Sequence, residues 1–329
     1  MRKAVCLFVL VLLASVATCW AQKGGVEIVD PKAAAEDPDF HVQGEYVGEL
    51  AKPDGGSQRI GAQVVARGDG NFEIYLLEGG LPGDGWHKGD KREQASGKRE
   101  GGATTIEGAA AGKIEDDTMT LQCSETGAKG TLRRVERTSP TLGDRPPKGA
   151  TVLYKDAGDA DHFESAEVSE DGNLVAGTAT KDKFNSFKLH LEFRLSWKPH
   201  AGGQARSNSG VYLHDCYEVQ VLDSFGLAGK DNECGGLYKV NEPDVNMCLP
   251  PLVWQTYDVE FTAPEYGASG EKTNCARLSV RHNGVVIHDD VELPQHTPGR
   301  QEEGPGPRPI HLQGHGNRVQ YRNIWLVPQ

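Results

Sequence analysis

Amphipathic helical periodicity is almost absent from this sequence, and apart from one short turn we expect no helix. The 329-residue chain also lacks clusters of Lys and Arg, because 35 basic residues are outnumbered by 47 acidic ones and the formal net charge is −12. An acidic chain without basic patches is a poor candidate for binding nucleic acid or anionic membranes. Beyond its first 22 residues it has no apolar run long enough to span a bilayer.

The residue patterns of common metal and cofactor sites are also missing. No two of the seven cysteines form a CxxC pair, which argues against a zinc site. His311 and His315 are separated by a strand end and a turn, and Asp289-Asp290 is more typical of a solvated turn than of a calcium site. The Gly-rich stretches lack the strand–loop–helix setting of phosphate sites. We therefore predict no metal and no cofactor.

The first 22 residues, MRKAVCLFVLVLLASVATCWAQ, have the pattern of a secretory signal peptide. A basic start is followed by an apolar run over residues 4–14 and then by small residues. We expect residues 1–21 to be a signal peptide, with cleavage after Ala17 or Ala21, and the mature protein to be exported, either periplasmic or secreted. A lipid anchor on Cys19 is the alternative.

Five cysteines remain after this segment, an odd number for an oxidising compartment. Cys234 and Cys248 flank a Gly-rich loop, and we expect this pair to form a disulfide. The alternative is that all five are small buried fillers.

The sequence divides into two β-rich units joined by a short linker. Residues 22–137 predict a small β domain, since RIGAQVVARGDGNFEIYLL contains two strand-like runs around Asp69-Gly70, a strong hairpin signal. No catalytic constellation occurs there, so we interpret it as an accessory module. Residues 138–150, TSPTLGDRPPKGA, hold three prolines and little that could be buried, and they form the predicted linker.

Strands dominate residues 151–329. In FKLHLEFRLSW, large apolar residues alternate with polar ones, and a second hairpin turns at Asn283-Gly284. Many strands with one apolar face each, separated by turns, are typical of a jelly-roll β-sandwich. The predicted fold class is therefore all-β, a jelly-roll sandwich preceded by a smaller β domain.

One register problem arises in the last strand. Val319 and Tyr321 share a face, whereas Ile324 and Leu326 would fall on the opposite one. A β-bulge near Asn323 would return all four side chains to the core.

Several strands carry long hydrogen-bonding side chains on their second face. They stand beside Gly-containing turns, Asn208-Ser209-Gly210 and Gly314-His315-Gly316-Asn317, which allow a ligand to approach the backbone. Such a surface suits a ligand covered in hydroxyl groups, and plain solvated surface is the alternative. The polar positions are Glu192, Arg194, Glu218, Gln220, His311, Gln313 and Arg322.

Four sequence blocks closely resemble the 3-keto-disaccharide hydrolase domain family. They are NSGVYLHDCYEVQVLDSFG, CGGLYKVNEPDVNMCLPPLVWQTYDVEF, NGVVIHDDVELP and PIHLQGHGNRVQYRNIWLVP, and they occur in family order from about residue 150 to the end. The resemblance implies a concanavalin A-like jelly roll acting on 3-keto-glycosides, which are glycosides oxidised to a ketone at sugar carbon 3. It also implies a sugar 3-oxidoreductase elsewhere that supplies this carbohydrate substrate.

The implied chemistry does not need the paired carboxylates of ordinary glycosidases. A ketone at C3 acidifies the hydrogen on C2, so a base can remove it and the C1 substituent can leave by elimination. Water then adds to the unsaturated ketone, and the net result is hydrolysis. Such a site needs one base, one acid or oxyanion partner, and positioning groups.

Within the resembling blocks, Glu218 is the candidate catalytic carboxylate, and His315 is a candidate base or acid near neutral pH. Asp223 is either a further acid–base residue or a turn cap. Relatives commonly carry Arg at the position of Cys216, so a non-catalytic, lectin-like carbohydrate-binding protein remains an alternative, as does a structural domain of the cell envelope. The substrate-binding candidates are Glu192, Asn208, Tyr212, Gln220, Gln313, Asn317 and Arg322.

Overall fold

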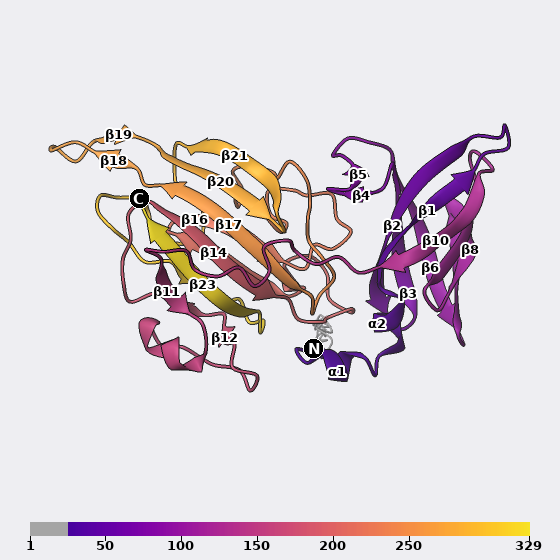
Figure 1. The fold of residues 1–329 in the computed structure, drawn as a ribbon, viewed down its shortest axis with the longest axis horizontal. Helices are drawn as coiled ribbons and strands as arrows, with labels where there is room; N and C mark the ends of the chain where they lie inside the picture. Colours follow the sequence, from indigo (N-terminus) through magenta and orange to yellow (C-terminus); the bar gives the residue numbers. More distant parts are fainter. Residues whose placement is uncertain (1–25) are drawn as a thin grey trace, which may run out of the picture.

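The computed structural model of the protein describes residues 26–329 and is nearly all β, with 48% strand and 6% helix. Figure 1 shows two β bodies, a barrel formed by the first part of the chain and a sandwich formed by the second. The predicted signal peptide and Cys19 lie outside the described residues. Within residues 26–329, no helix combines the length and the apolar character needed to cross a membrane.

The first body is a closed barrel of eight antiparallel strands. Two short helices precede it, and each begins at a proline that follows a capping aspartate, Asp30 or Asp37. The predicted hairpin at Asp69-Gly70 is confirmed, since both residues have positive φ angles of 55° and 72°. The elements are α1 (Pro31–Ala34), α2 (Pro38–Val42), β1 (Gly44–Ala51), β2 (Ser57–Gly68), β3 (Asn71–Glu78), β6 (Arg92–Glu100), β7 (Ala103–Gly108), β8 (Ala110–Glu115), β9 (Thr118–Cys123) and β10 (Lys129–Val135), closed in the order β1-β10-β9-β8-β7-β6-β3-β2.

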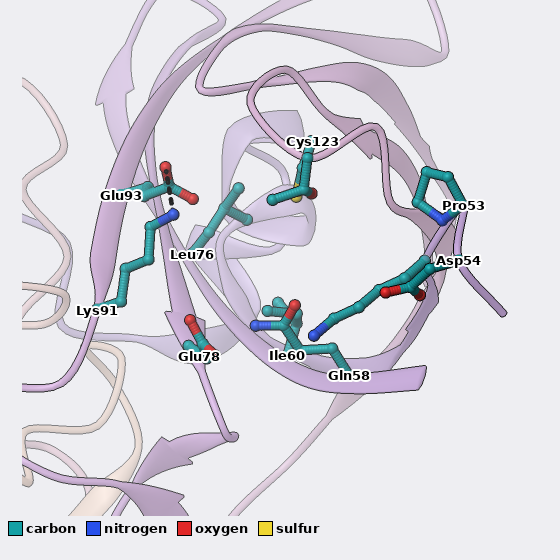
Figure 2. A pocket seen from close by; sticks show the side chains of 11 residues that line it. Pro53, Asp54, Gln58, Ile60, Leu76, Glu78, Lys91, Glu93 and Cys123 are labelled. Atoms are coloured by element: carbon teal, nitrogen blue, oxygen red, sulfur yellow. Dashed lines mark ion pairs between the residues drawn. The ribbon is translucent and has the colours of Figure 1, made fainter. Parts of the chain in front are cut away.

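The barrel interior is packed, but one mouth is hollow. Side chains such as Tyr46 and Met119 are completely buried inside it. Figure 2 shows the mouth, where Leu76 and Cys123 lie beside the ion pair of Lys91 and Glu93, whose charged atoms are 3.4 Å apart. This cavity of about 470 Å³ is lined by barrel residues alone. Closure leaves no free sheet edge in the barrel.

The second body is a sandwich of two antiparallel sheets, which confirms the predicted jelly-roll class. Short elements between its strands include η1 (Ala157–His162), η2 (Gly203–Ala205), β18 (Glu265–Tyr266) and β19 (Lys272–Asn274), whereas β4 (Leu81–Pro82) and β5 (Gly85–Trp86) lie between β3 and β6 of the barrel. The seven-stranded sheet contains β11 (Thr151–Tyr154), β23 (Gln320–Pro328), β14 (Phe187–Arg194), β17 (Trp254–Thr262), β20 (Ala276–His282) and β21 (Val285–Leu293), with β12 (Leu174–Val175) beside β23. The four-stranded sheet contains β13 (Thr178–Ala179), β22 (His311–Leu312), β15 (Asn208–Leu213) and β16 (Tyr217–Leu222).

Alternation along the strands builds the sandwich core. Leu191 and Phe193 of β14 and Val219 and Val221 of β16 belong to one core cluster and are completely buried. Burying a side chain of this size stabilises the fold by about 1.5–3 kcal/mol. The hairpin at Asn283-Gly284, joining β20 and β21, is as predicted.

The expected β-bulge in the last strand is confirmed. Glu192 pairs with Arg322 and His190 with Trp325, so the register between β14 and β23 shifts by one residue. Asn323 has a φ of 45° there, and both Tyr321 and Ile324 are buried.

The five described cysteines are all free, so the expected disulfide between Cys234 and Cys248 is not formed. The two thiols are close enough for each to shift the pKa of the other, and each sulfur also has a further partner. Cys234 Sγ lies 3.2 Å from the Tyr257 hydroxyl, and Cys248 Sγ donates to the Leu222 carbonyl at 3.6 Å. Both side chains are buried, and the alternative of small buried fillers describes them better.

The predicted linker packs against the outer face of the seven-stranded sheet. The Gly143 amide donates to Glu192 Oε1 at 2.7 Å, and the Asn323 side chain donates to the Asp144 carbonyl at 3.0 Å. Ser139 is buried, with its Oγ 2.6 Å from that of Thr256. The expectation that this segment holds little to bury was therefore wrong at Ser139, because the sheet offers it hydroxyl partners. The division into domains at residues 138–150 stays a prediction.

Beneath the linker lies a charged cluster formed by His190, Glu192, Asp258 and Arg322. His190 Nδ1 is 2.6 Å from Asp258 Oδ1, and Arg322 Nε is 2.7 Å from Glu192 Oε2. Burial alone would lower the pKa of His190, but hydrogen bonds and charges from Asp258 and Glu192 raise it to about 9. Burial would raise the pKa of Glu192, but donors that include His190 lower it to about 2.

This cluster predicts a loss of stability at alkaline pH. The folded-state pKa of His190 lies above its ordinary value of 6.5, so its contribution is complete below pH 6.5 and is lost as the pH rises through about 9. Urea unfolding should give a free energy about 3 kcal/mol lower at pH 9.5 than at pH 6. The dependence of the unfolding free energy on pH should be much weaker in His190→Gln and unchanged in the exposed control His87→Gln. An equal slope in all three proteins would contradict the assignment.

Candidate functional site

The outer face of the four-stranded sheet gathers the polar residues of three neighbouring strands. β15 is flanked by β22 and β16, so Tyr212 lies directly opposite both His311 and Glu218. One step along, Gly210 lies opposite Gln220, and its carbonyl accepts the Gln313 amide at 2.8 Å. These pairings bring together side chains from sequence blocks about 90 residues apart.

Glu218 is the most unusual carboxyl group in this cluster. The residue is only 2% exposed, and its Oε2 accepts a hydrogen bond from the Tyr212 hydroxyl at 2.7 Å. Among residues 26–329, no other side chain or amide donates to this carboxylate within hydrogen-bond distance. Burial raises the pKa of Glu218 to about 7, although the hydrogen bond from Tyr212 opposes the rise. A buried carboxyl that titrates near neutral pH suits a general base.

A glycine on the neighbouring strand makes room for this carboxyl group. A Cβ atom at Gly210 would lie 2.1 Å from Glu218 Oε1, which no real side chain could tolerate. The Glu218 side chain therefore lies across the backbone of β15 at Gly210.

Tyr212 connects Glu218 to further polar groups. Gln313 Nε2 donates to the Tyr212 hydroxyl at 3.4 Å, and the His311 ring centre is 6.0 Å from that of Tyr212. Burial, with a smaller effect of the positive charge on Arg300, lowers the pKa of His311 to about 4, so its imidazole is neutral near pH 7. Arg300 lies 5.9 Å from the Tyr212 ring centre and is held by Asp215 at 2.5 Å.

Arg300, Asp215 and Thr297 were missed by sequence reasoning. Thr297 Oγ1 accepts the Glu218 amide at 2.9 Å, and the Thr297 amide donates to the Cys216 carbonyl at 3.0 Å. These residues come from turns and from the loop after β21, where no alternation signal exists. His311 was recognised as a polar-face residue, but no role in the site was predicted for it.

A second group of amides lies beside Glu218. The Asn208 side chain donates to the carbonyl and the Oε1 of Gln204 at 2.9 and 3.0 Å, and Gln220 Nε2 contacts the same Oε1 at 3.4 Å. The backbone amide of Asn208 donates to Asn317 Oδ1 at 2.9 Å. Within the described chain, Asn208 Oδ1 is buried without a donor, so one acceptor in this group is unsatisfied.

The structure leaves the predicted acid outside this network. His315 is exposed in the turn that joins Gln313 to Asn317, so it lies in the same loop as two cluster residues. No described hydrogen bond or ion pair connects its ring to Glu218. Its role as an acid stays a prediction.

Asp223 is occupied by structural contacts. Its side chain is completely buried, with Oδ2 2.5 Å from Arg206 Nε, and its Oδ1 accepts the Phe225 amide at 3.3 Å. Arg206 also donates to the barrel carbonyl of Ala66 at 3.1 Å. A carboxylate held in this way caps its turn and ties the two bodies together, so of the two sequence alternatives the structure favours the turn cap.

Glu192 and Arg322 are not part of this cluster. They pair with each other on the outer face of the seven-stranded sheet, beneath the linker, whereas Glu218 lies on the four-stranded sheet. The sequence expectation of one continuous polar surface was wrong here, because alternation identifies the outer face of a strand but not the sheet to which it belongs. Cys216 is buried among core residues, and burial raises its pKa to about 12.

Within residues 26–329, no group of three or more His, Cys, Asp or Glu side chains is arranged to hold a metal ion.

The Tyr212 hydrogen bond should control the titration of Glu218. Because this bond stabilises the carboxylate, Tyr212→Phe is expected to raise the pKa of Glu218 by about one unit. Carbon-13 NMR titration of labelled glutamate side chains would measure it, with Glu218→Gln identifying the signal. Tyr217→Phe is the matched control, since its hydroxyl donates to Glu303 at 2.6 Å and the Glu218 titration should not move. An unchanged pKa in Tyr212→Phe would contradict the assigned contact.

Comparison with known proteins places the second part of the chain in a family. The family of 3-keto-alpha-glucoside-1,2-lyase-like domains matches residues 149–327, more than half of the chain. Among curated proteins, no sequence match is found. Two crystal structures of candidate glycosyl hydrolases from Parabacteroides distasonis ATCC 8503 are similar. One is 29% identical with a TM-score of 0.49, covering 56% of this chain and 85% of its own. The other is 16% identical with a TM-score of 0.40, covering 55% and 94%. On the family match, which includes every polar residue around Glu218, this chain belongs to the 3-keto-alpha-glucoside-1,2-lyase-like domain family.

Proposed function

We propose that this protein cleaves 3-keto-glycosides, including 3-keto-disaccharides, with Glu218 as the base. The observation that carries the proposal is the buried Glu218 carboxyl group, whose pKa is raised to about 7 by burial and which has Tyr212 as its one described donor. Membership in the family supports a glycoside-acting enzyme. The reaction and the oxidation state of the substrate are the proposal.

The proposed reaction begins with transfer of the C2 proton to Glu218. The electron pair of the broken C–H bond moves into the C2–C3 bond and places negative charge on the oxygen of the C3 ketone. Collapse of this enolate forms a C1–C2 double bond and breaks the bond from C1 to the aglycone oxygen, which leaves with its electron pair and takes up a proton. Water then adds across the double bond, with its oxygen on C1 and a proton on C2, which gives the free 3-keto sugar.

The neighbours of Glu218 match the remaining needs of this reaction. Tyr212 remains protonated because burial, together with the nearby Glu218 carboxylate, raises its pKa, so it remains a hydrogen-bond donor. The neutral His311 ring and the Gln313 amide stand beside it and are suited to donate to the enolate oxygen. Asn208, Gln220 and Asn317 are proposed to hold sugar hydroxyls, and His315 to protonate the leaving oxygen.

Two further parts of the proposal concern the surroundings of the enzyme. The ketone must be made by a separate sugar 3-oxidoreductase, because the proposed proton transfers and the elimination leave the oxidation level of the sugar unchanged. Export is proposed from the signal-like pattern of residues 1–21.

Product analysis tests the proposal directly. Purified residues 22–329 are incubated with 3-keto-trehalose, 3-keto-lactose and an aryl 3-keto-glucoside, with the parent sugars alongside. Release of aglycone from the keto forms alone is expected. Glu218→Gln should lower the rate by about 10²–10⁴-fold while binding persists, whereas Glu192→Gln, on the opposite sheet, should retain activity. Binding of keto sugars without release would indicate a lectin-like protein, and no binding at all would favour a structural role.

The pH dependence should follow the base. Glu218 must be ionised to accept the C2 proton, so kcat/KM is expected to rise with pH and level off above an apparent pKa of about 7. In Tyr212→Phe, this midpoint should move upward together with the pKa measured by NMR. A rate that falls as the pH rises from 5 to 8 would exclude Glu218 as the base.

A further inference from the structure

A lysine of the barrel reaches the part of the sandwich that borders the candidate site. Figure 1 shows the segment with β4 and β5 projecting from the barrel toward the sandwich. Lys88, at the end of this segment, donates to the Gly229 carbonyl at 2.9 Å, to the Pro243 carbonyl at 3.1 Å and to Glu242 Oε2 at 2.8 Å. An ammonium group has three protons, so these three acceptors satisfy all of them.

These contacts close the base of one loop, residues 229–243, which we name the flanking loop. Its two ends meet at Lys88, since a Cβ atom at Gly229 would lie 3.5 Å from Pro243 Cγ. Close by, Arg92 of β6 donates to the Gly226 carbonyl at 2.5 Å. Apart from isolated bridges the flanking loop has no helix or strand of its own, so its shape depends on such anchors.

The other side of the flanking loop pairs with β16, the strand that carries Glu218. The Gln220 amide donates to the Gly236 carbonyl at 2.9 Å, and the Gly235 amide donates to the Gln220 carbonyl at the same distance. The Tyr238 amide donates to the Glu218 carbonyl at 3.3 Å. The flanking loop thus covers the free edge of β16.

Side chains extend this connection into the binding groups. The Asn232 carbonyl of the flanking loop accepts Gln204 Nε2 at 2.8 Å, and Gln204 in turn binds Asn208 and Gln220. The Tyr238 side chain is close enough to Tyr212 to contribute to the raised pKa of Tyr212. The Asn208–Gln220 group and Tyr212 are therefore both near the flanking loop, and Lys88 of the barrel holds the two ends of this loop together.

We propose that Lys88 is a positioning residue and that the barrel serves the sandwich by fixing the flanking loop before substrate binds. The closed barrel holds the ammonium at one place, so the entropy of ordering the loop is lost during folding rather than during binding. This inference rests on the proposed function for its effect on catalysis, but the effect of Lys88 on the loop can be measured without substrate.

The test compares the full mature chain with Lys88→Met, which keeps the length of the side chain but removes the charge. Hydrogen exchange followed by mass spectrometry is expected to be about tenfold faster at the amides of Gly235, Gly236 and Tyr238, with barrel strands unchanged. For aryl 3-keto-glucoside, KM should rise about tenfold while kcat changes less than threefold, because the loop supports the binding groups Asn208 and Gln220 through Gln204 and does not contact the Glu218 carboxyl group. Lys88→Arg should restore most of the loss.

Lys113→Met is the matched control, because Lys113 pairs with Glu115 on the barrel surface at 2.8 Å and does not contact the sandwich. Unchanged exchange of the loop in Lys88→Met would overturn the proposal whatever the activity. Faster exchange with an unchanged KM would overturn the link between the loop and the site. If the wild-type chain releases no aglycone from any keto sugar, the proposed function fails, and loop exchange alone decides whether Lys88 anchors the loop.

Discussion

The candidate site depends on one carboxyl group buried where almost nothing stabilises its charge. Glu218 lies on the outer face of the four-stranded sheet, but the loop after β21 and the flanking loop shield it from water. Gly210 leaves the space that its carboxylate fills, and Tyr212 supplies its described hydrogen bond. Each of these features follows from the pairing of β15 with β16. The register of these two strands therefore determines the electrostatic environment of Glu218.

The sandwich tolerates this carboxyl group because its stability comes from the opposite faces of the same strands. Val219 and Val221 alternate with Glu218 and Gln220 along β16 and are completely buried in the core. The apolar face therefore provides the burial energy, and the polar face is free to carry groups that do not improve stability. The hydrogen bonds from the barrel to Gly229 and Gly226, and from Arg206 to the barrel, involve turns and loops of the sandwich rather than the residues around Glu218. They therefore add stability without occupying the candidate site.

Sequence patterns predicted the positions of the strands better than they predicted which strands lie side by side in a sheet. Alternation placed Glu218 and Glu192 correctly on outward faces, and the conflict between Tyr321 and Ile324 correctly required a bulge at Asn323. Alternation carries no information about which sheet a strand joins, so the separation of Glu192 from Glu218 could not be predicted. Asp223 shows the same limit, since its partner Arg206 comes from a turn with no periodicity.

Glu192 and Glu218 also explain why a list of buried carboxylates does not identify a base. Both are almost completely buried, yet the pKa of Glu192 falls to about 2 and that of Glu218 rises to about 7. The His190 ring, 3.8 Å from Glu192, and hydrogen bonds from Asn323, Arg322 and the Gly143 amide together outweigh the cost of burying the Glu192 charge. Among residues 26–329, Glu218 has a single donor, the neutral Tyr212 hydroxyl, so the effect of burial dominates its pKa. The difference arises from His190 on β14 and from the donors supplied by β23 and the linker. A carboxylate becomes a usable base at neutral pH only where the fold provides few such donors.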